Sequence, residues 1–489
     1  MSLSTLRARL RPLLAWLRSA DGFAYLALMA LALAVRLALA PNLMKSFDMG
    51  TYEYWGHLAN IDLLHVYSLG GKGPNWLYYP NYPPVAIYFY GLIDKVVFGL
   101  AALLGLPLAH DVRHSSLLQV VFKLPGIIAD LALLTILYVK ALDALDRRWV
   151  VWLLCATYAI SPGVLITVVF WGQTDGLVLL GVVVALFFAL RRQPVWCGVL
   201  LALVVNFKPQ PIVFAPLALV YLWRWGGFRM VVRGAIAFLG VTLLVWLPYL
   251  IPPFGELGAL AHNVGVAQAK EGLAASRDGW NLWYALGVPT QSVSSRLIGS
   301  LTVNEVGYAL FVIVILIAMI GVWRRPRPSR MWSGAAIIAL AMFTVTPLQL
   351  ERYLFPALGL FFLAALYDRR YWLIYGVVSV TFMANFGSEV LASSNDRISS
   401  RIPAHLHRVL LLHLDSWQGG VINCVALLLA IIYFLWPRVT ATEQAPTMRA
   451  TDALPILPTF GLSGPPGVPA SLVAAPAERA TRTQGDASG

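Results

Sequence analysis

Six ionisable residues lie inside or at the ends of apolar runs, where an unpaired charge is unfavourable. They are Lys123, Asp130, Asp175, Lys208, Glu351 and Arg352. A charged residue costs about 2.5–3.5 kcal/mol at the centre of a membrane-spanning helix, even on the lenient insertion scale. Together with a carboxylate-bearing loop near the first apolar run, these residues outline a polar cavity. In such a cavity carboxylates could accept protons and cations could bind an anion.

Each of these residues also has a purely structural interpretation. Lys123 and Asp130 lie two turns apart on one helix face and could form an ion pair. Asp175 could cap the helix that begins beside it. Lys208 and Arg352 could extend toward the membrane interface. Considered singly, these residues leave both interpretations open.

Asp48 is the first candidate for a proton acceptor. It follows the first apolar run by a few residues, and Phe47 and Met49 flank it with apolar surface. A carboxylate there is poorly solvated, which suits it to accept a proton from a hydroxyl group. Glu53 follows in the same loop and is the alternative base.

The composition is that of a helical membrane protein with many spans. The chain has 489 residues, 59% hydrophobic and 12% charged, with a mean hydropathy of +0.72, which a soluble protein of this size does not reach. The net charge of +13 sits mostly in short clusters between apolar runs, as in cytoplasmic loops, so no nucleic-acid partner is predicted. Cys155, Cys197 and Cys424 lie in apolar runs and predict neither disulfides nor a thiolate metal site.

The apolar runs predict an all-α bundle of about 11–13 transmembrane helices. They lie near 22–41, 118–140, 148–168, 174–191, 195–206, 210–224, 232–251, 305–323, 332–347, 353–367, 371–391 and 420–437. The run 195–206 is short and is followed by Lys208-Pro209. This pattern is typical of a helix that stops early and lines a cavity with its end.

The stretch Val85–Leu108 is apolar enough to cross, but Pro83-Pro84 precedes it and Asp94-Lys95 interrupts it. If it crossed, the arginine clusters of the short connections would lie outside. These are Arg147–Arg148, Arg191–Arg192, Arg224–Arg233 and Arg324–Arg330. If it lies along the outer interface, all of them, with Arg369–Arg370, become cytoplasmic, as the positive-inside rule requires. The outer loop 392–419 with its three arginines is the exception, and the interfacial arrangement is favoured.

This topology predicts three parts of the chain. Residues 1–20 form a cytoplasmic juxtamembrane helix, and residues 21–437 form the membrane domain. Residues 438–489, rich in Pro, Gly, Ala, Ser and Thr, form a disordered cytoplasmic tail. The long loops 42–117, with interfacial helices, and 252–304 are extracytoplasmic.

An ordered set of segments resembles the GT-C superfamily of polyprenyl-phosphate-sugar-dependent membrane glycosyltransferases. The segments are FDMGTYEYWGHLAN, YPNYPPVAIYFY, SPGVLITVVFWGQTDG, LVVNFKPQPIVFAPLAL and LERYLFPAL. The most similar branch is the dolichyl-phosphate-glucose-dependent glucosyltransferases of the N-glycan pathway and their bacterial relatives. The resemblance extends in order over most of residues 1–390.

The resemblance implies roles for particular residues. Asp48 matches the catalytic base, and Tyr82-Pro83-Pro84 matches a Tyr-Pro-Pro element. Asn206-Phe207-Lys208 matches an Asn-Tyr-Lys-Gln motif, with Pro209 inserted before Gln210. The late His-Glu pair of eukaryotic members is matched only by Glu351, which has no His before it.

The chemistry of sugar transfer agrees with these roles. An acceptor hydroxyl must lose its proton as it attacks the anomeric carbon, which needs one carboxylate: Asp48, with Glu53 in reserve. The lipid phosphate leaves as a stable anion, which Lys208 and Arg352 would bind. The remaining candidates would bind the sugar or the acceptor. They are Trp55, Tyr82, Gln173, Asp175, Gln210, Trp280, Asn281, Trp283 and Glu351. For the tryptophans alone, an interfacial belt is the alternative.

The sequence thus predicts a hexosyltransferase that uses a polyprenyl-phosphate sugar and an extracytoplasmic lipid-linked or glycan acceptor, among membrane lipids. Inversion and no cofactor are expected. No metal is expected because no metal-ligand cluster is evident, and the absence of an Asp-x-Asp motif disfavours a nucleotide-sugar donor. A bacterial plasma membrane with an outward-facing site is favoured. A secondary transporter or flippase for a lipid-linked or anionic substrate is the alternative, and it would predict an internal repeat. A non-catalytic lipid-binding or scaffold protein is the third class, and it would tolerate loss of Asp48.

Overall fold

A computed structural model describes residues 16, 19–41, 47–71, 75, 78–108, 110, 112, 115–250, 255–392 and 414–436. The chain divides into two units, 1–445 and 446–489, and the second lies wholly outside the described residues. Most of the predicted juxtamembrane helix 1–20 and all of the predicted tail 438–489 also lie outside them. Both remain predictions.

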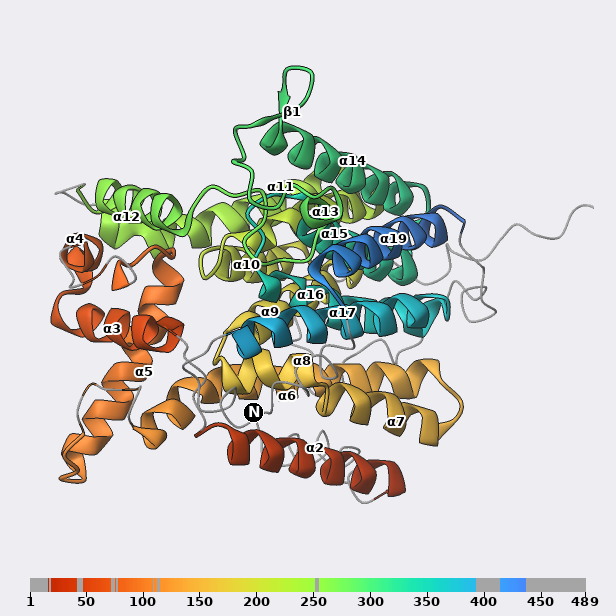
Figure 1. The fold of residues 1–489 in the computed structure, drawn as a ribbon. Helices are drawn as coiled ribbons and strands as arrows, with labels where there is room; N and C mark the ends of the chain where they lie inside the picture. The colour runs from red at the N-terminus through yellow and green to blue at the C-terminus, as the bar shows by residue number, and fades with distance from the viewer. Residues whose placement is uncertain are drawn as a thin grey trace, which may run out of the picture. The chain divides into compact units, whose positions relative to one another are not determined.

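The described part of the chain is almost entirely helical, which confirms the prediction of an all-α polytopic membrane protein (Figure 1). The helices are α2 (Ala20–Leu39), α3 (Phe47–Ile61), η1 (Leu63–His65), α4 (Val66–Gly70), α5 (Pro84–Leu103), α6 (Ser116–Ala144), α7 (Arg148–Ala159), α8 (Pro162–Leu165), η3 (Ile166–Phe170), α9 (Asp175–Leu190), α10 (Pro194–Val205), η4 (Gln210–Phe214), α11 (Ala215–Leu250), α12 (Gly255–Glu271), α13 (Leu282–Ala285), α14 (Val303–Arg324), α15 (Pro328–Val345), η5 (Glu351–Leu354), α16 (Phe355–Tyr367), α17 (Tyr371–Ala392) and α19 (Ser416–Leu435). Strands β1 (Arg296–Ile298) and β2 (Leu301–Thr302) form one antiparallel pair.

Six of the described helical segments are long and apolar enough to cross a membrane, and seven if the bent pair Arg148–Ala159 and Pro162–Phe170 is one span. This is fewer than the 11–13 helices predicted. Part of the reason is length: α9 and α10 have 16 and 12 residues. At about 1.5 Å per residue they rise about 24 and 18 Å, less than the roughly 30 Å of a hydrocarbon core.

A second reason is a break within α11. Gly227 has φ 64° and ψ −165°, which are not helical angles, so two helices meet there. Only glycine adopts such a backbone conformation without steric strain. The two halves correspond to the separate apolar runs predicted at 210–224 and 232–251.

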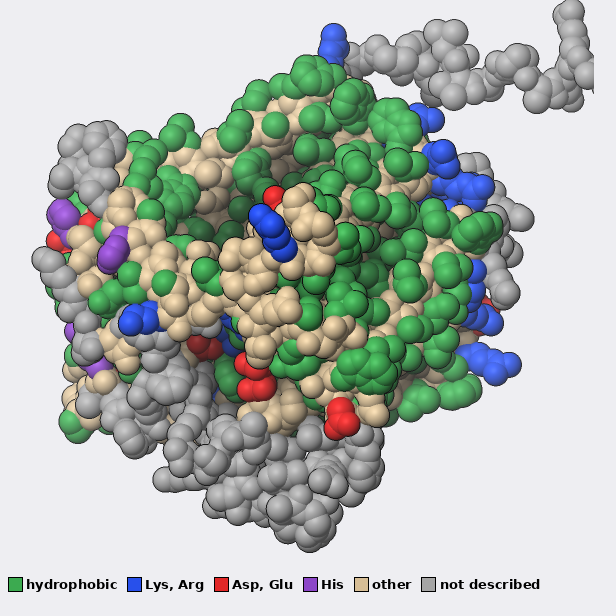
Figure 2. Space-filling view, turned by 45° about the horizontal axis from the view of Figure 1, so that its top comes forward, with side chains coloured by type: hydrophobic (Ala, Val, Ile, Leu, Met, Phe, Trp, Pro, Cys, Tyr) green, Lys and Arg blue, Asp and Glu red, His purple; other side chains and the backbone are tan. Residues whose placement is uncertain are grey.

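The helices of the bundle alternate between two ends. The connections after α9 and α16 carry Arg191-Arg192 and Arg369-Arg370, whereas α10 and α15 run the other way, toward Lys208 and Glu351. Lys and Arg side chains accordingly gather along the right-hand edge of the molecule in Figure 2, away from α3 and α5. The arginine clusters therefore share one end of the bundle.

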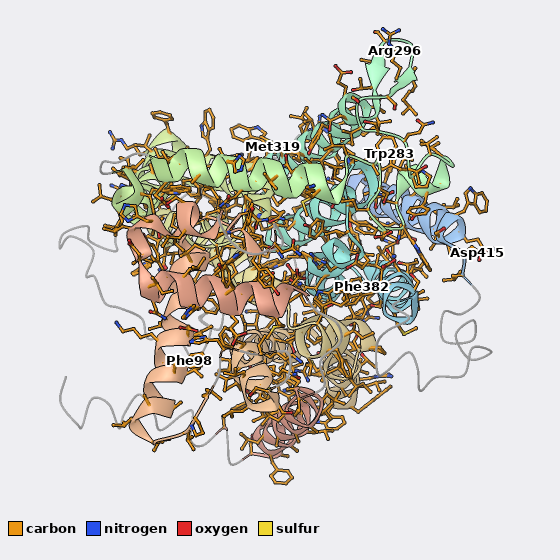
Figure 3. The ribbon with its side chains drawn as sticks, turned by 60° about the vertical axis from the view of Figure 1, so that its left-hand side comes forward. Phe98, Trp283, Arg296, Met319, Phe382 and Asp415 are labelled. Atoms are coloured by element: carbon orange, nitrogen blue, oxygen red, sulfur yellow. The ribbon has the colours of Figure 1, made fainter. Side chains whose placement is uncertain are left out.

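Helix α5 runs across the direction of α2, α6 and α7, as Figures 1 and 3 both show. Pro83 is extended, and Pro84 occupies the first helical turn, where proline is favoured because its missing N–H is not needed. The prolines therefore start this helix. Its 20 residues are apolar enough to span, so its placement along the outer interface stays a prediction.

The ion pair considered between Lys123 and Asp130 does not form. The fully buried Asp130 carboxylate is bound by Arg36 of α2 at 2.5 Å and accepts a hydrogen bond from the Tyr158 hydroxyl at 3.0 Å. Lys123 Nζ instead donates to the Ala40 carbonyl at 2.8 Å. Arg36 lies inside the first apolar run, which was the available signal. The Arg36–Asp130 ion pair links α2 to α6, and the hydrogen bond from Tyr158 links α7 to the same carboxylate.

Candidate active site

Asp48 lies in the first turn of α3, where the helix dipole favours a negative charge. Its Oδ2 accepts hydrogen bonds from Trp171 Nε1 at 2.8 Å and from Gln173 Nε2. Arg352 Nη2 lies 3.7 Å from the same oxygen, and the Asp48 side chain is 29% exposed. A carboxylate held by two neutral donors beside one cation, yet open to solvent, can receive a substrate hydroxyl.

The segment after η3 brings both donors to Asp48 because of a glycine between them. Gly172 has φ +74°, a conformation that favours glycine, and a Cβ atom there would clash with Met49. The chain therefore turns sharply and passes close to the start of α3. Trp171 and Gln173 reach one carboxylate from either side of this turn.

The orientation of Gln173 is fixed by a second hydrogen bond. The buried Gln173 side chain accepts a hydrogen bond at its Oε1 from the Tyr52 hydroxyl at 3.1 Å. Tyr52 stacks on Tyr90 with ring centroids 4.5 Å apart, and burial raises the pKa of Tyr52 well above its usual range. Tyr52 therefore keeps its proton, which directs the amide group of Gln173 toward Asp48.

Arg352 links two carboxylates. Its Nη2 lies 3.7 Å from Asp48, and its Nη1 lies 3.5 Å from Glu351 Oε1. Burial opposes the charge of Arg352, but Asp48 and Glu351 raise its pKa well above the usual value, so the guanidinium stays positive. Burial raises the pKa of Glu351, with Arg352 opposing and Asp278 and Asp48 adding to the rise.

The second cation, Lys208, pairs with Asp175 at 2.5 Å, and both side chains are buried. Burial alone would lower the pKa of Lys208, but the Asp175 carboxylate raises it above the usual range. Lys208 Nζ lies 5.9 Å from the ring centroids of both Tyr82 and Tyr353, and Arg352 lies 5.8 Å from the Tyr353 ring. The two tyrosines thus place both cations in one cluster with Asp48.

The early end of α10 positions Lys208, as the sequence predicted. Asn206 closes the helix, donates to Thr242 Oγ1 at 2.9 Å and accepts from Trp246 Nε1 at 2.6 Å. Its carbonyl also accepts the N–H of Val85 at 3.0 Å. These bonds fix the end of α10 against α11 and α5.

A small, largely apolar pocket lies beside Lys208 and is partly open to solvent. Its walls are Asp175, Val178, Leu179, Val182, Lys208, Gln210, Pro211, Phe214, Met342, Tyr353 and Pro356. Gln210 Oε1 is buried there without a hydrogen-bond partner among the described residues. Asp175 and Lys208 pair in its wall, while aliphatic and aromatic side chains form most of the rest, which suits an amphipathic ligand.

Glu53 does not join this cluster. It is buried, and its Oε2 accepts the N–H of Val112 at 2.9 Å. Five helical residues turn the chain by roughly 500°, so Glu53 lies about 140° around α3 from Asp48. The predicted reserve base therefore faces another part of the protein.

The predicted sugar-binding tryptophans are enclosed by protein. Trp55 is 2% exposed and donates to the Tyr78 carbonyl at 2.8 Å. Trp280 and Trp283 are 5% and 0% exposed, and Asn281 caps α13 by accepting the N–H of Trp283 at 3.1 Å. Their rings pack in the interior, so in this conformation none presents a face to a sugar. The interfacial belt is not supported for these three either.

Three residues of the cluster were not singled out in the sequence. Trp171 stands two residues before Gln173, Tyr353 follows Arg352, and Asp278 precedes the Trp280 segment. Each lies beside a residue that was selected, and this adjacency was the available signal. Asp278, with φ +68°, also has its pKa raised by burial and interacts electrostatically with Glu351.

The sequence profile described as glycosyltransferase family 87 matches residues 97–347, just over half of the chain. No curated protein matches the chain. The matched range includes Gln173, Asp175 and Lys208, whereas Asp48 and Arg352 lie outside it. Their assignment rests on the geometry above.

Proposed function

Because the chain belongs to glycosyltransferase family 87, we propose that it transfers a hexose from a polyprenyl-phosphate donor to an acceptor hydroxyl. Asp48 acts as the base, and Lys208 and Arg352 bind the departing phosphate. The observation that carries this proposal is the meeting of Asp48 with Arg352 at 3.7 Å, within the cluster that also holds Lys208. The base and the cations are then close enough to act on the attacking hydroxyl and on the leaving phosphate of one substitution at the anomeric carbon.

The hydrogen bonds of Asp48 support its role as the base. Trp171, Gln173 and Arg352 all contact its Oδ2. Among the described residues, Oδ1 accepts no hydrogen bond and is available to an acceptor hydroxyl. A single base suffices because a phosphate leaving group departs without being protonated, and attack from the opposite side of the sugar inverts the anomeric carbon.

The cavity beside Lys208 supports a lipid-linked donor. Its lining is mostly apolar and includes Lys208 and Gln210, so we place the lipid against the apolar walls and the phosphate beside Lys208. An aliphatic chain buried there gains about 25 cal/mol per Å² of apolar surface. A nucleotide sugar would leave these walls unfilled.

A group of carboxylates supports binding of a hydroxyl-rich acceptor. Asp278 and Glu351 both interact electrostatically with Glu389 of α17. Carboxylate oxygens accept hydrogen bonds from sugar hydroxyls. The acceptor is therefore a glycan or a glycolipid.

The proposed site lies on the extracytoplasmic side of a bacterial plasma membrane. The arginine-rich connections share the opposite end of the bundle, which the positive-inside rule assigns to the cytoplasm. The loops 42–117 and 252–304 are then outside, and we place α5 along the outer interface.

Release of polyprenyl phosphate tests this function. Purified protein in detergent would be incubated with polyprenyl-phosphate glucose, mannose and other hexoses, with and without glycan acceptors. Release of polyprenyl phosphate with one sugar, together with a new glycosidic product, is expected. Movement of intact donor across a vesicle membrane without release would instead indicate the transporter or flippase alternative.

A further inference from the structure

Three side chains from separate segments converge where α3 packs against α5, away from Asp48. They are His57 of α3, Asp94 of α5 and His110 of the segment before α6. One potential ligand atom from each lies within 4.8 Å of the others. The sequence predicts no metal site because these residues are far apart along the chain.

Glycine makes this approach possible. A Cβ atom on Gly56, next to His57, would lie 2.9 Å from Asp94 Cβ and 2.6 Å from the Tyr90 carbonyl oxygen. A Cβ atom on Gly91 would likewise lie 3.0 Å from Ala59 Cβ. The helices therefore pack with their backbones close together, which places Asp94 beside the histidine.

One oxygen of the Asp94 carboxylate is held by a hydrogen bond, and the other is buried without one among the described residues. Asn60 Nδ2 donates to Asp94 Oδ2 at 2.8 Å, and to the Gly91 carbonyl at 3.1 Å. Asp94 is 3% exposed, and its buried Oδ1 has no hydrogen-bond partner among the described residues. That oxygen points toward His110, whose Nδ1 lies 3.5 Å away.

His110 is held in place by its neighbours. Its ring stacks on Phe98 of α5 with centroids 3.7 Å apart, and Figure 3 labels Phe98 on that helix. The His57 and His110 rings have centroids 4.1 Å apart. Two imidazoles this close, beside one buried carboxylate oxygen, form a convergent set of donors.

We propose that His57, Asp94 and His110 bind a zinc ion. Zinc binds imidazole nitrogen and carboxylate oxygen at about 2.0–2.2 Å, so tetrahedral ligand atoms lie about 3.3 Å apart. The 3.5 Å between His110 Nδ1 and Asp94 Oδ1 is close to this spacing. Magnesium and calcium prefer sites built from oxygen alone. A water molecule would complete the zinc coordination.

The zinc ion has a positioning role, because it lies far from the reacting groups. His57 follows Asp48 on α3 by nine residues, which is about 14 Å of helix at 1.5 Å per residue. The ion would tie α3 to α5 and to the segment before α6. It thereby fixes the helix whose first turn carries Asp48.

Metal analysis of the purified full-length protein tests this proposal. We expect about one zinc ion per chain, and a cobalt(II) spectrum of four-coordinate type after exchange. His110→Ala should lose the metal without unfolding, because the His110 side chain is 37% exposed. Asn60→Ala should weaken binding by about 10–100-fold by releasing Asp94.

His65→Ala is the matched control. His65 forms an exposed pair with Asp62 at 2.8 Å, which resembles the His110–Asp94 contact but lacks a second histidine. This variant should keep the zinc ion and the cobalt spectrum. Wild-type protein without zinc after supply of the ion would overturn the proposal. Equal zinc content in His110→Ala and His65→Ala would do the same.

Discussion

Asp48→Asn should slow sugar transfer by about 10²–10⁴-fold, the usual contribution of a general base. The variant keeps the size of the side chain, and its amide oxygen can still accept hydrogen bonds from Trp171 and Gln173. The proton acceptor and the negative charge are lost. Because Asp48 is 29% exposed and lies 3.7 Å from Arg352, loss of this ion pair should change stability by about 1 kcal/mol or less.

Donor binding should respond in the opposite direction. Removing the negative charge of Asp48 leaves Arg352 with one carboxylate fewer, so the guanidinium becomes more available to a phosphate. A gain of about 1 kcal/mol would tighten donor binding roughly fivefold. Single-turnover kinetics would give the transfer rate, and competition with labelled polyprenyl phosphate would give the dissociation constant.

Glu53→Gln is the matched control on the same helix. It removes the same charge, and its amide oxygen can still accept the N–H of Val112. This variant should retain turnover. If Glu53→Gln loses turnover while Asp48→Asn keeps most of it, Glu53 is the base. If both variants keep turnover, the base lies elsewhere and the proposed mechanism fails.

Three further outcomes are expected. Lys208→Ala and Arg352→Ala should each raise the barrier to transfer by about 2.7–4 kcal/mol. Arg277→Ala is the control and should leave the barrier unchanged, because Arg277 is a loop residue that donates to the Gly272 carbonyl. Unchanged kinetics in both Lys208→Ala and Arg352→Ala would assign these two cations a structural role. Arg36→Met should lower stability by about 3–5 kcal/mol because it leaves Asp130 buried and unpaired, and Arg36→Met with Asp130→Leu should recover most of that loss in thermal unfolding. A cysteine placed at Arg147 should react with a membrane-impermeant reagent only from the cytoplasmic side, and labelling from outside would refute the topology.

The sequence was most informative where a single local property decides the structure. Apolar length predicts the helical class, and Lys208-Pro209 predicts the early end of α10 at Val205. The number of spans was harder to predict because short apolar helices such as α9 and the break at Gly227 depend on packing. The Lys123–Asp130 pair could be considered from the sequence but does not form, for a related reason. Helix periodicity finds partners on the same helix, whereas Arg36 reaches Asp130 from a different one.

In the candidate site, too, the sequence predicts the local motifs but not how distant segments pack together. The motifs that carry Asp48, Gln173, Lys208 and Arg352 are separate in the sequence, and the fold brings them into one cluster. Residue type alone could not separate an enclosed tryptophan such as Trp55 from one that lines a binding site. Convergence of distant residues also explains why the histidine and carboxylate group near α5 could not be found from spacing.

The charges of the proposed site imply an order of events. Lys208 pairs with Asp175, and Arg352 lies beside both Asp48 and Glu351. An incoming phosphate must compete with these carboxylates for the two cations. The Lys208–Asp175 pair is short and buried, whereas the Arg352–Asp48 contact is long and 29% exposed on the aspartate side. In the proposed mechanism the phosphate would therefore draw Arg352 away from Asp48, and binding of the donor would free the base for the acceptor hydroxyl.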